Sequence, residues 1–176
     1  NYKNIVGNYY PPKTVNIYPT FCLSLDRSKI VEGVFEAIKI CFAKSDEDYE
    51  KVWESVAFRH GEIHIDYEHL IHTSLSAKKY FIEIDEFDRG PRLLLNFGHT
   101  FGHALEAASH FEIPHGIAVG LGMLMACEFS YESGLVAHES ERVQKLKNDI
   151  YRLLRFTGSL EKLVKRTNKD KFLQAF

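Results

Sequence analysis

The stretch RLLLNFGHTFGHALEAASHFEIPH, residues 92–115, decides how this chain folds. Four polar side chains in it, Arg92, Asn96, His99 and His103, follow one another at spacings of four, three and four. In a helix of about 3.6 residues per turn, these spacings place all four on one face. Most of the other positions are apolar, and a helix that is apolar almost all round is normally buried. The pattern predicts a buried helix whose polar stripe faces the interior or a cleft.

Burial of such a stripe is costly unless a metal, an ion or a ligand satisfies it. His99 and His103 form H-x-x-x-H, a spacing that can place two imidazoles on one metal ion. His110 and His115 follow closely, so the spacing alone leaves the choice of ligands among the four histidines open. A third ligand would have to come from another helix.

The glycines of the same stretch predict close backbone packing. Gly98 and Gly102 each cost about 1 kcal/mol relative to alanine inside a helix. Gly116, Gly120 and Gly122 follow in a segment without any acidic or basic residue between His115 and Glu128. We expect other backbone to approach these positions and the second segment to lie in the core.

The composition is that of an ordinary globular chain. With 176 residues, 45% hydrophobic and 26% charged, it is expected to form one domain, or one domain and a piece of another. A net charge of −2 implies no general attraction to nucleic acid or to a membrane surface. Three isolated cysteines, no long apolar run and no secretory signal favour a reducing, cytoplasmic setting. The missing initiator methionine suggests a fragment or a processed chain.

Along the chain, a strand-bearing lead is expected to precede a helical domain. Residues 13–21 alternate apolar and polar side chains after Pro11-Pro12, which predicts a short strand or two. From residue 25 the pattern predicts about seven helices. Helix starts are predicted at the capping residues Asp26 or Ser28, Ser45, Asp66 and Ser140, and a helix end at Gly134. In the helix that follows Asp66, the residues expected to face inward are Leu70, Ile71, Leu75 and Phe81.

Four charged residues, Glu36, Lys39, Lys78 and Arg92, can be interpreted as surface residues or as parts of a site. Glu36 and Lys39, three apart on one predicted helix, would ordinarily be a surface ion pair, and Lys78 a solvated lysine. Lys39, Lys78 and Arg92 could instead build a cationic pocket for a small phosphorylated or carboxylated substrate. The chain contains no glycine-rich nucleotide-binding loop.

The motifs resemble one known family. R-L-L-L-N-F-G-H-T-F-G-H-A-L-E-A, followed by I-P-H-G-I-A-V-G-L-G-M, resembles the signature of 3-dehydroquinate synthases, which are sugar-phosphate cyclases. K-N-I-V-G-N-Y-Y-P-P, E-G-V-F-E-A-I-K and I-D-E-F-D-R-G-P-R also resemble segments of that family, up to about residue 136. The resemblance implies the C-terminal, mainly α-helical part of a two-domain fold. Residues 25–176 would be the metal- and substrate-binding domain, and residues 1–24 a remnant of an N-terminal α/β domain that binds NAD.

The resemblance also implies site residues. Glu36, His99 and His115 would bind a catalytic zinc ion, or another divalent ion such as Co²⁺. Lys39, Lys78 and His103 would be catalytic. The substrate would be contacted by Asn4, Lys39, Lys78, Arg92, Asn96 and His103, with Lys171 as a further candidate because Asp170-Lys171-Phe172 only partly matches the family's tail motif.

The implied reaction converts 3-deoxy-arabino-heptulosonate 7-phosphate to 3-dehydroquinate and phosphate, in the shikimate pathway of aromatic amino-acid biosynthesis. This is an NAD- and zinc-dependent carbon–oxygen lyase reaction, with NAD held mainly by the absent N-terminal domain. We therefore expect a small phosphorylated sugar acid as the partner and a homodimer for the full-length protein. The chain alone is expected to have little or no activity.

Other functions remain open. A related cyclase of the aminodehydroquinate or valiolone synthase type would share most motifs, and glycerol dehydrogenase-like enzymes share the two-domain plan but lack the double-histidine run. A non-catalytic helical interaction module would have kept the motif without binding metal. The chain also departs from the family at Ile117 and Asp88, where glutamate is usual, and at Ile40-Cys41, where Tyr-Gly is usual.

Overall fold

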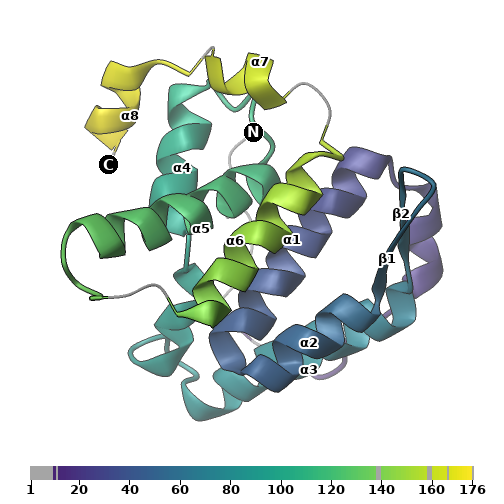
Figure 1. The fold of residues 1–176 in the computed structure, drawn as a ribbon. Coiled ribbons are helices and arrows are strands. Elements are labelled where there is room, and N and C mark those ends of the chain that lie inside the picture. The colour runs from purple at the N-terminus through teal and green to yellow at the C-terminus, as the bar shows by residue number, and fades with distance from the viewer. Residues whose placement is uncertain (1–9, 11, 138–139, 158–159, 166, 176) are drawn as a thin grey trace.

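The computed structural model describes residues 10, 12–137, 140–157, 160–165 and 167–175. Within this part, helices dominate and one short antiparallel hairpin is present (Figure 1), which confirms the mainly α prediction. In chain order the elements are η1 (Pro19–Ser24), α1 (Arg27–Lys44), α2 (Asp46–Glu54), β1 (Val56–Arg59), β2 (Glu62–Ile65), α3 (Tyr67–Ile84), η2 (Pro91–Asn96), α4 (His99–Ala108), α5 (His115–Glu132), α6 (Glu141–Leu154), α7 (Leu160–Lys165) and α8 (Lys169–Ala175).

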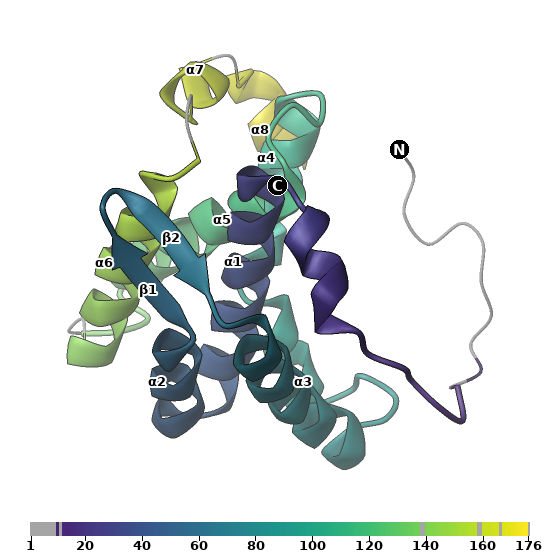
Figure 2. The ribbon, with the colours of Figure 1, turned by 90° about the vertical axis from the view of Figure 1, so that its right-hand side faces the viewer.

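Helix α1 forms the centre of the core. Val31, Val34, Phe35 and Ile38 recur at helical spacing, and each is fully buried. Helices α2, α3 and α5 pack against α1, while the hairpin lies beside α2 (Figure 2). The same helix therefore carries the core and, at Glu36, a polar group that its neighbours surround.

Helices α4 and α5 cross at very close range, as the glycines predicted. A Cβ atom on Gly122 would lie 2.0 Å from the carbonyl oxygen of Gly98, and one on Gly102 would lie 3.1 Å from the carbonyl oxygen of Ala118. Most of α5 from Gly116 to Leu124 is buried, in keeping with its lack of charge. The crossing brings the first residues of α4 and α5 close together.

The prediction of a single helix from Arg92 onward is wrong, because the helix is interrupted before His99. Residues 91–96 form the 3₁₀ helix η2, and Gly98 has φ of +77°, outside the helical region. Leu93 and Leu94 are about half exposed. Gly98 interrupts the helix where α5 passes, so the four polar residues do not lie on one continuous helix.

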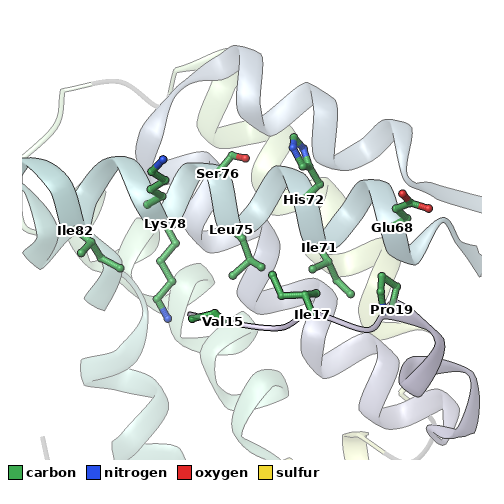
Figure 3. A pocket seen from close by; sticks show the side chains of 11 residues that line it. Val15, Ile17, Pro19, Glu68, Ile71, His72, Leu75, Ser76, Lys78 and Ile82 are labelled. Atoms are coloured by element: carbon green, nitrogen blue, oxygen red, sulfur yellow. The ribbon is translucent and has the colours of Figure 1, made fainter. Parts of the chain in front are cut away.

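The strand predicted over residues 13–21 is also wrong for this structure. The segment before η1 is extended, but it forms no ladder with any described residue, and a strand requires a hydrogen-bonded neighbour. Val15 and Ile17 instead lie against α3, where they line an apolar groove (Figure 3). Leu75, predicted to face inward, is 39% exposed in the same groove.

The hairpin was not predicted from the sequence. Strands β1 and β2 pair from Val56 with Ile65 to Arg59 with Glu62. The two-residue loop His60-Gly61 has φ of +52° and +76°, as a type I′ turn requires. Four-residue strands are too short to show alternation clearly, and histidine is an unusual first turn residue.

The predicted caps are largely confirmed. The side chains of Ser45, Asp66 and Ser140 accept hydrogen bonds from backbone N–H groups in the first turns of α2, α3 and α6. Asp26 stands at the N-cap of α1 without a side-chain bond. No helix in the described ranges has the length and apolar character needed to cross a bilayer.

Candidate metal centre

Three side chains from three helices converge on one point. Glu36 comes from α1, His99 is the first residue of α4, and His115 is the first residue of α5. The Nε2 atoms of both histidines lie 3.7 Å from Oε1 of Glu36. One donor atom from each residue lies within 4.8 Å of the other two. The close α4–α5 crossing therefore joins residues 16 positions apart in sequence to a carboxylate from the core helix.

The geometry fits a divalent metal ion. Zinc bound tetrahedrally at about 2.1 Å separates its ligand atoms by about 3.4 Å, close to the spacing here. Oε1 of Glu36 is buried and accepts no hydrogen bond from any described residue. A buried carboxylate oxygen without a partner is costly, and a cation would satisfy it. Two imidazoles and one carboxylate also leave a fourth position open, as in catalytic zinc sites.

Lys39 occupies the other side of the carboxylate. Its Nζ donates to Oε2 of Glu36 over 2.9 Å, and the residue is only 4% exposed. Burial lowers the pKa of Lys39, Glu36 opposes this, and Lys78 lowers the pKa further. Burial alone would raise the pKa of Glu36, but Lys39 and the two histidines outweigh it and hold that pKa below its ordinary value. The pair is therefore part of the site, not a surface ion pair.

His99 is prepared for metal binding. Burial, followed by the positive charge of Lys39, lowers the pKa of His99 to about 4, so the ring is neutral near pH 7. A metal ligand has to be the neutral imidazole. The Nδ1 atom lies 3.4 Å from the carbonyl oxygen of Phe97, which leaves Nε2 facing Glu36.

The role of Glu106 was not predicted from the sequence. The residue lies on α4, is 7% exposed, and places Oε2 3.1 Å from Nδ1 of His115. His103, Glu106 and His115 form a second group whose donor atoms lie within 4.8 Å of one another. The signal available in the sequence was H-x-x-E, which places Glu106 one turn after His103 on the same helix face.

His103 and Lys78 lie near the cluster without belonging to it. The ring centroid of His103 is 5.2 Å from that of His99 and 5.9 Å from that of His115, and the side chain is exposed. Lys78 is exposed on α3, close enough to lower the pKa of Lys39, and lines the groove beside Val15 and Ile17 (Figure 3).

Three other predicted substrate residues, Arg92, Asn96 and Lys171, make different contacts in this structure. Nη1 of Arg92 donates to the carbonyl oxygen of Glu86 over 2.8 Å. Asn96 is exposed and lines a pocket of about 670 Å³ that contains none of the three cluster residues. Lys171, on α8, contacts Nε2 of His110 at the far end of α4. Asn4 lies outside the described residues.

The residues at which the chain departs from the family pattern lie in different surroundings. Ile117 is 2% exposed and packs in the hydrophobic core. Asp88 is exposed with φ of +56°, in a turn between α3 and η2. Cys41 is buried, and burial raises the pKa of its thiol to about 12.

Comparison with known proteins gives a consistent result. The family described as "3-dehydroquinate synthase C-terminal" matches residues 33–172. The 3-dehydroquinate synthases of Clostridium botulinum and Clostridium acetobutylicum are 39% and 38% identical, over 76% and 84% of this chain. That of Dehalococcoides mccartyi is 40% identical over 84%. The chain spans 38–41% of the length of these relatives. It belongs to the 3-dehydroquinate synthase C-terminal family.

Proposed function

We propose that this chain is the metal- and substrate-binding part of a 3-dehydroquinate synthase that uses zinc and NAD. The reaction would convert 3-deoxy-arabino-heptulosonate 7-phosphate to 3-dehydroquinate and phosphate. The observation that carries the proposal is the convergence of His99 and His115 on Oε1 of Glu36, a buried oxygen that accepts no hydrogen bond from the described residues. The names of the relatives support the same reaction.

A zinc ion held by these three residues would act as a Lewis acid toward the substrate's hydroxyl groups. The chain's own contribution is to hold a flexible, anionic substrate beside it. Helices α4 and α5 both begin at the cluster, and the free N–H groups and dipole of a helix N-terminus favour anions. Lys39 and Lys78 add positive charge on the side of α1 and α3.

His103 is suited to proton transfer rather than to metal binding. Its ring lies beside both histidine ligands but is open to solvent, so it can exchange protons with water. Lys39 is a buried cation bonded to Glu36, and this contact would orient it toward a substrate oxygen. Arg92, Asn96, Lys171 and Asn4 remain proposed substrate contacts on the resemblance alone.

The redox part of the reaction would belong to NAD. Elimination of phosphate requires a transient ketone beside the C–H bond that breaks, which a nicotinamide cofactor supplies by reversible oxidation. We propose that the region that the longer relatives have before this part binds the cofactor. We further propose a cytoplasmic homodimer for the whole enzyme.

Zinc calorimetry on the chain tests the metal site. We expect one zinc ion per chain for the wild type and for His110→Ala, a matched histidine variant outside the cluster. His99→Ala should lose affinity by more than the roughly 10- to 100-fold typical of an outer-shell partner. Equal binding by all three proteins would contradict the proposed ligands, and no binding by the wild type would favour a non-catalytic helical module.

An activity assay tests the substrate. The chain would be joined to the N-terminal part of the Clostridium acetobutylicum relative, and phosphate release would be measured with NAD and zinc. We expect turnover with 3-deoxy-arabino-heptulosonate 7-phosphate, and loss of turnover with retained zinc in His103→Ala. Preference for sedoheptulose 7-phosphate would assign the chain to a valiolone synthase-like cyclase instead.

A further inference from the structure

We propose that Glu106 is a positioning residue for the metal centre. Its carboxylate holds the ring of His115 through Nδ1, so that the lone pair of Nε2 faces Glu36 and His99. Glu106 touches neither the metal nor the substrate in this arrangement. The inference rests on the metal site proposed above and adds the group that orients one of its ligands.

The first observation is the burial of Glu106. The residue is 7% exposed, although a glutamate is almost never buried without a partner. The side-chain partner that the structure gives it is His115, at 3.1 Å between Oε2 and Nδ1. The contact joins the third turn of α4 to the first residue of α5, across the tight crossing of the two helices.

The second observation is the division of roles between the two ring nitrogens of His115. Nδ1 faces an acceptor, so it carries the proton and donates it to Glu106. Nε2 is then unprotonated and lies 3.7 Å from Oε1 of Glu36. His99 has the same arrangement, with Nδ1 toward the Phe97 carbonyl and Nε2 toward Glu36. Both imidazoles thus present Nε2 to the proposed metal position.

A carboxylate behind a metal-binding imidazole has a known physical effect. It fixes the tautomer and the ring orientation, and it makes the ligand more basic. A carbonyl group, as behind His99, gives a weaker acceptor than an ionised carboxylate. We therefore expect Glu106 to contribute more to metal affinity than the carbonyl of Phe97.

The same atoms could in principle form a cation site of their own, from His103, Glu106 and His115. Two facts favour the positioning role. His103 is exposed whereas Glu106 is buried, so the group has no common enclosed centre. The nitrogen of His115 nearest Glu106 is Nδ1, and it cannot donate its proton to the carboxylate while binding a cation.

The test measures zinc binding and the His115 tautomer separately. Glu106→Ala should weaken zinc binding roughly 10- to 100-fold by calorimetry, and Glu106→Gln less, because an amide oxygen still accepts from Nδ1. Ser109→Ala is the matched control: its hydroxyl bonds the Glu106 carbonyl and receives the N–H of Ile113, so it perturbs the same turn without touching His115. It should bind zinc as the wild type does.

The tautomer is read by ¹⁵N NMR of the histidine side chains in the metal-free chain. The wild type should show His115 protonated at Nδ1, and Glu106→Ala should lose that preference. Glu106→Gln keeps the side-chain volume, so it serves where the alanine variant unfolds. Unchanged zinc affinity and tautomer in the Glu106 variants, or an equal loss in Ser109→Ala, would overturn the positioning role.

Two further outcomes separate this inference from the proposed function. Loss of zinc in His103→Ala with zinc retained in His99→Ala would place the cation in the second group and overturn the positioning role. Failure of the wild type to bind zinc would overturn the proposed metal function. The NMR result would then still decide whether Glu106 fixes the His115 ring.

Discussion

Nζ of Lys39 lies 2.9 Å from Oε2 of Glu36, while Oε1 of the same carboxylate accepts no hydrogen bond from the described residues. One oxygen of Glu36 is therefore held by a buried ammonium and the other is turned toward two imidazoles. Oε2 is thus held in place by Lys39, and Oε1 remains available to bind a cation. With a metal ion bound, Lys39 would both support the proposed ligand Glu36 and repel the ion.

We predict that Lys39→Met binds zinc more tightly than the wild type at low ionic strength. Removing a positive charge near the ion removes repulsion, which is on the order of 1–4 kcal/mol for charges a few ångströms apart at intermediate to high dielectric. Calorimetry measures the change. Lys44→Met, on the same helix and paired with Asp48, is the control and should leave zinc affinity unaltered. Weaker binding in Lys39→Met alone would show that support of Glu36 outweighs repulsion.

We predict that the metal-free chain loses stability as pH falls from 7 to 5. Burial, with Lys39, holds the pKa of His99 at about 4 in the folded chain, against about 6.5 when unfolded. Between these values the unfolded chain binds the extra proton, so acid favours unfolding. The contribution of His99 to this loss is at most about 2 kcal/mol.

Urea unfolding with a chelator at several pH values measures this loss. The chain contains nine histidines, so the contribution of His99 is the difference in slope between the wild type and His99→Gln. His99→Gln should show the flatter dependence between pH 5 and 7. Parallel curves would contradict the lowered pKa of His99.

We predict that Gly122→Ala disrupts the crossing of α4 and α5. The added Cβ would lie 2.0 Å from the carbonyl oxygen of Gly98, and backbone on both helices would have to move. We expect a loss of about 3 kcal/mol or more in the free energy of unfolding, together with loss of zinc binding. Denaturant unfolding and calorimetry on the same samples measure both.

The matched control is Gly33→Ala, in α1, where a Cβ would meet no atom within 4 Å. It should be neutral or should stabilise by about 0.5–1 kcal/mol, because alanine has the higher helix propensity. Equal stability of the two alanine variants would contradict the close crossing of α4 and α5.

We predict that Tyr49→Phe destabilises the chain by about 1–2 kcal/mol. Tyr49 is 2% exposed and its hydroxyl donates to Oδ2 of Asp149 over 2.8 Å, which links α2 to α6. Burial raises the pKa of Asp149, and loss of the hydroxyl removes a hydrogen bond that lowers it. Tyr151→Phe, at an exposed tyrosine on α6, should change stability by less than about 0.5 kcal/mol in thermal unfolding.

Much of the fold followed from local patterns in the sequence. The buried face of α1, the caps at Ser45 and Asp66, and the glycine-lined approach of α5 all depend on residue type and spacing. The continuous helix predicted over η2 and α4 is interrupted at Gly98. Gly98 has a positive φ and packs against the backbone of α5, and its neighbours in sequence do not reveal this contact. The lead segment at Val15 and Ile17 has strand composition, but a strand depends on a partner that local sequence does not contain.

For the site, the sequence by itself determined the chemical groups: imidazoles at His99 and His115, a carboxylate at Glu36, and glycines that let two helices touch. The spacing left four histidines open, and the resemblance named His99 and His115; only the tertiary structure shows their nitrogens meeting at Glu36, with Glu106 behind His115. The reason is physical. Periodicity fixes neighbours within one helix, whereas this centre is made by three helix positions that meet only when the α4–α5 crossing and the packing of α5 on α1 are both in place.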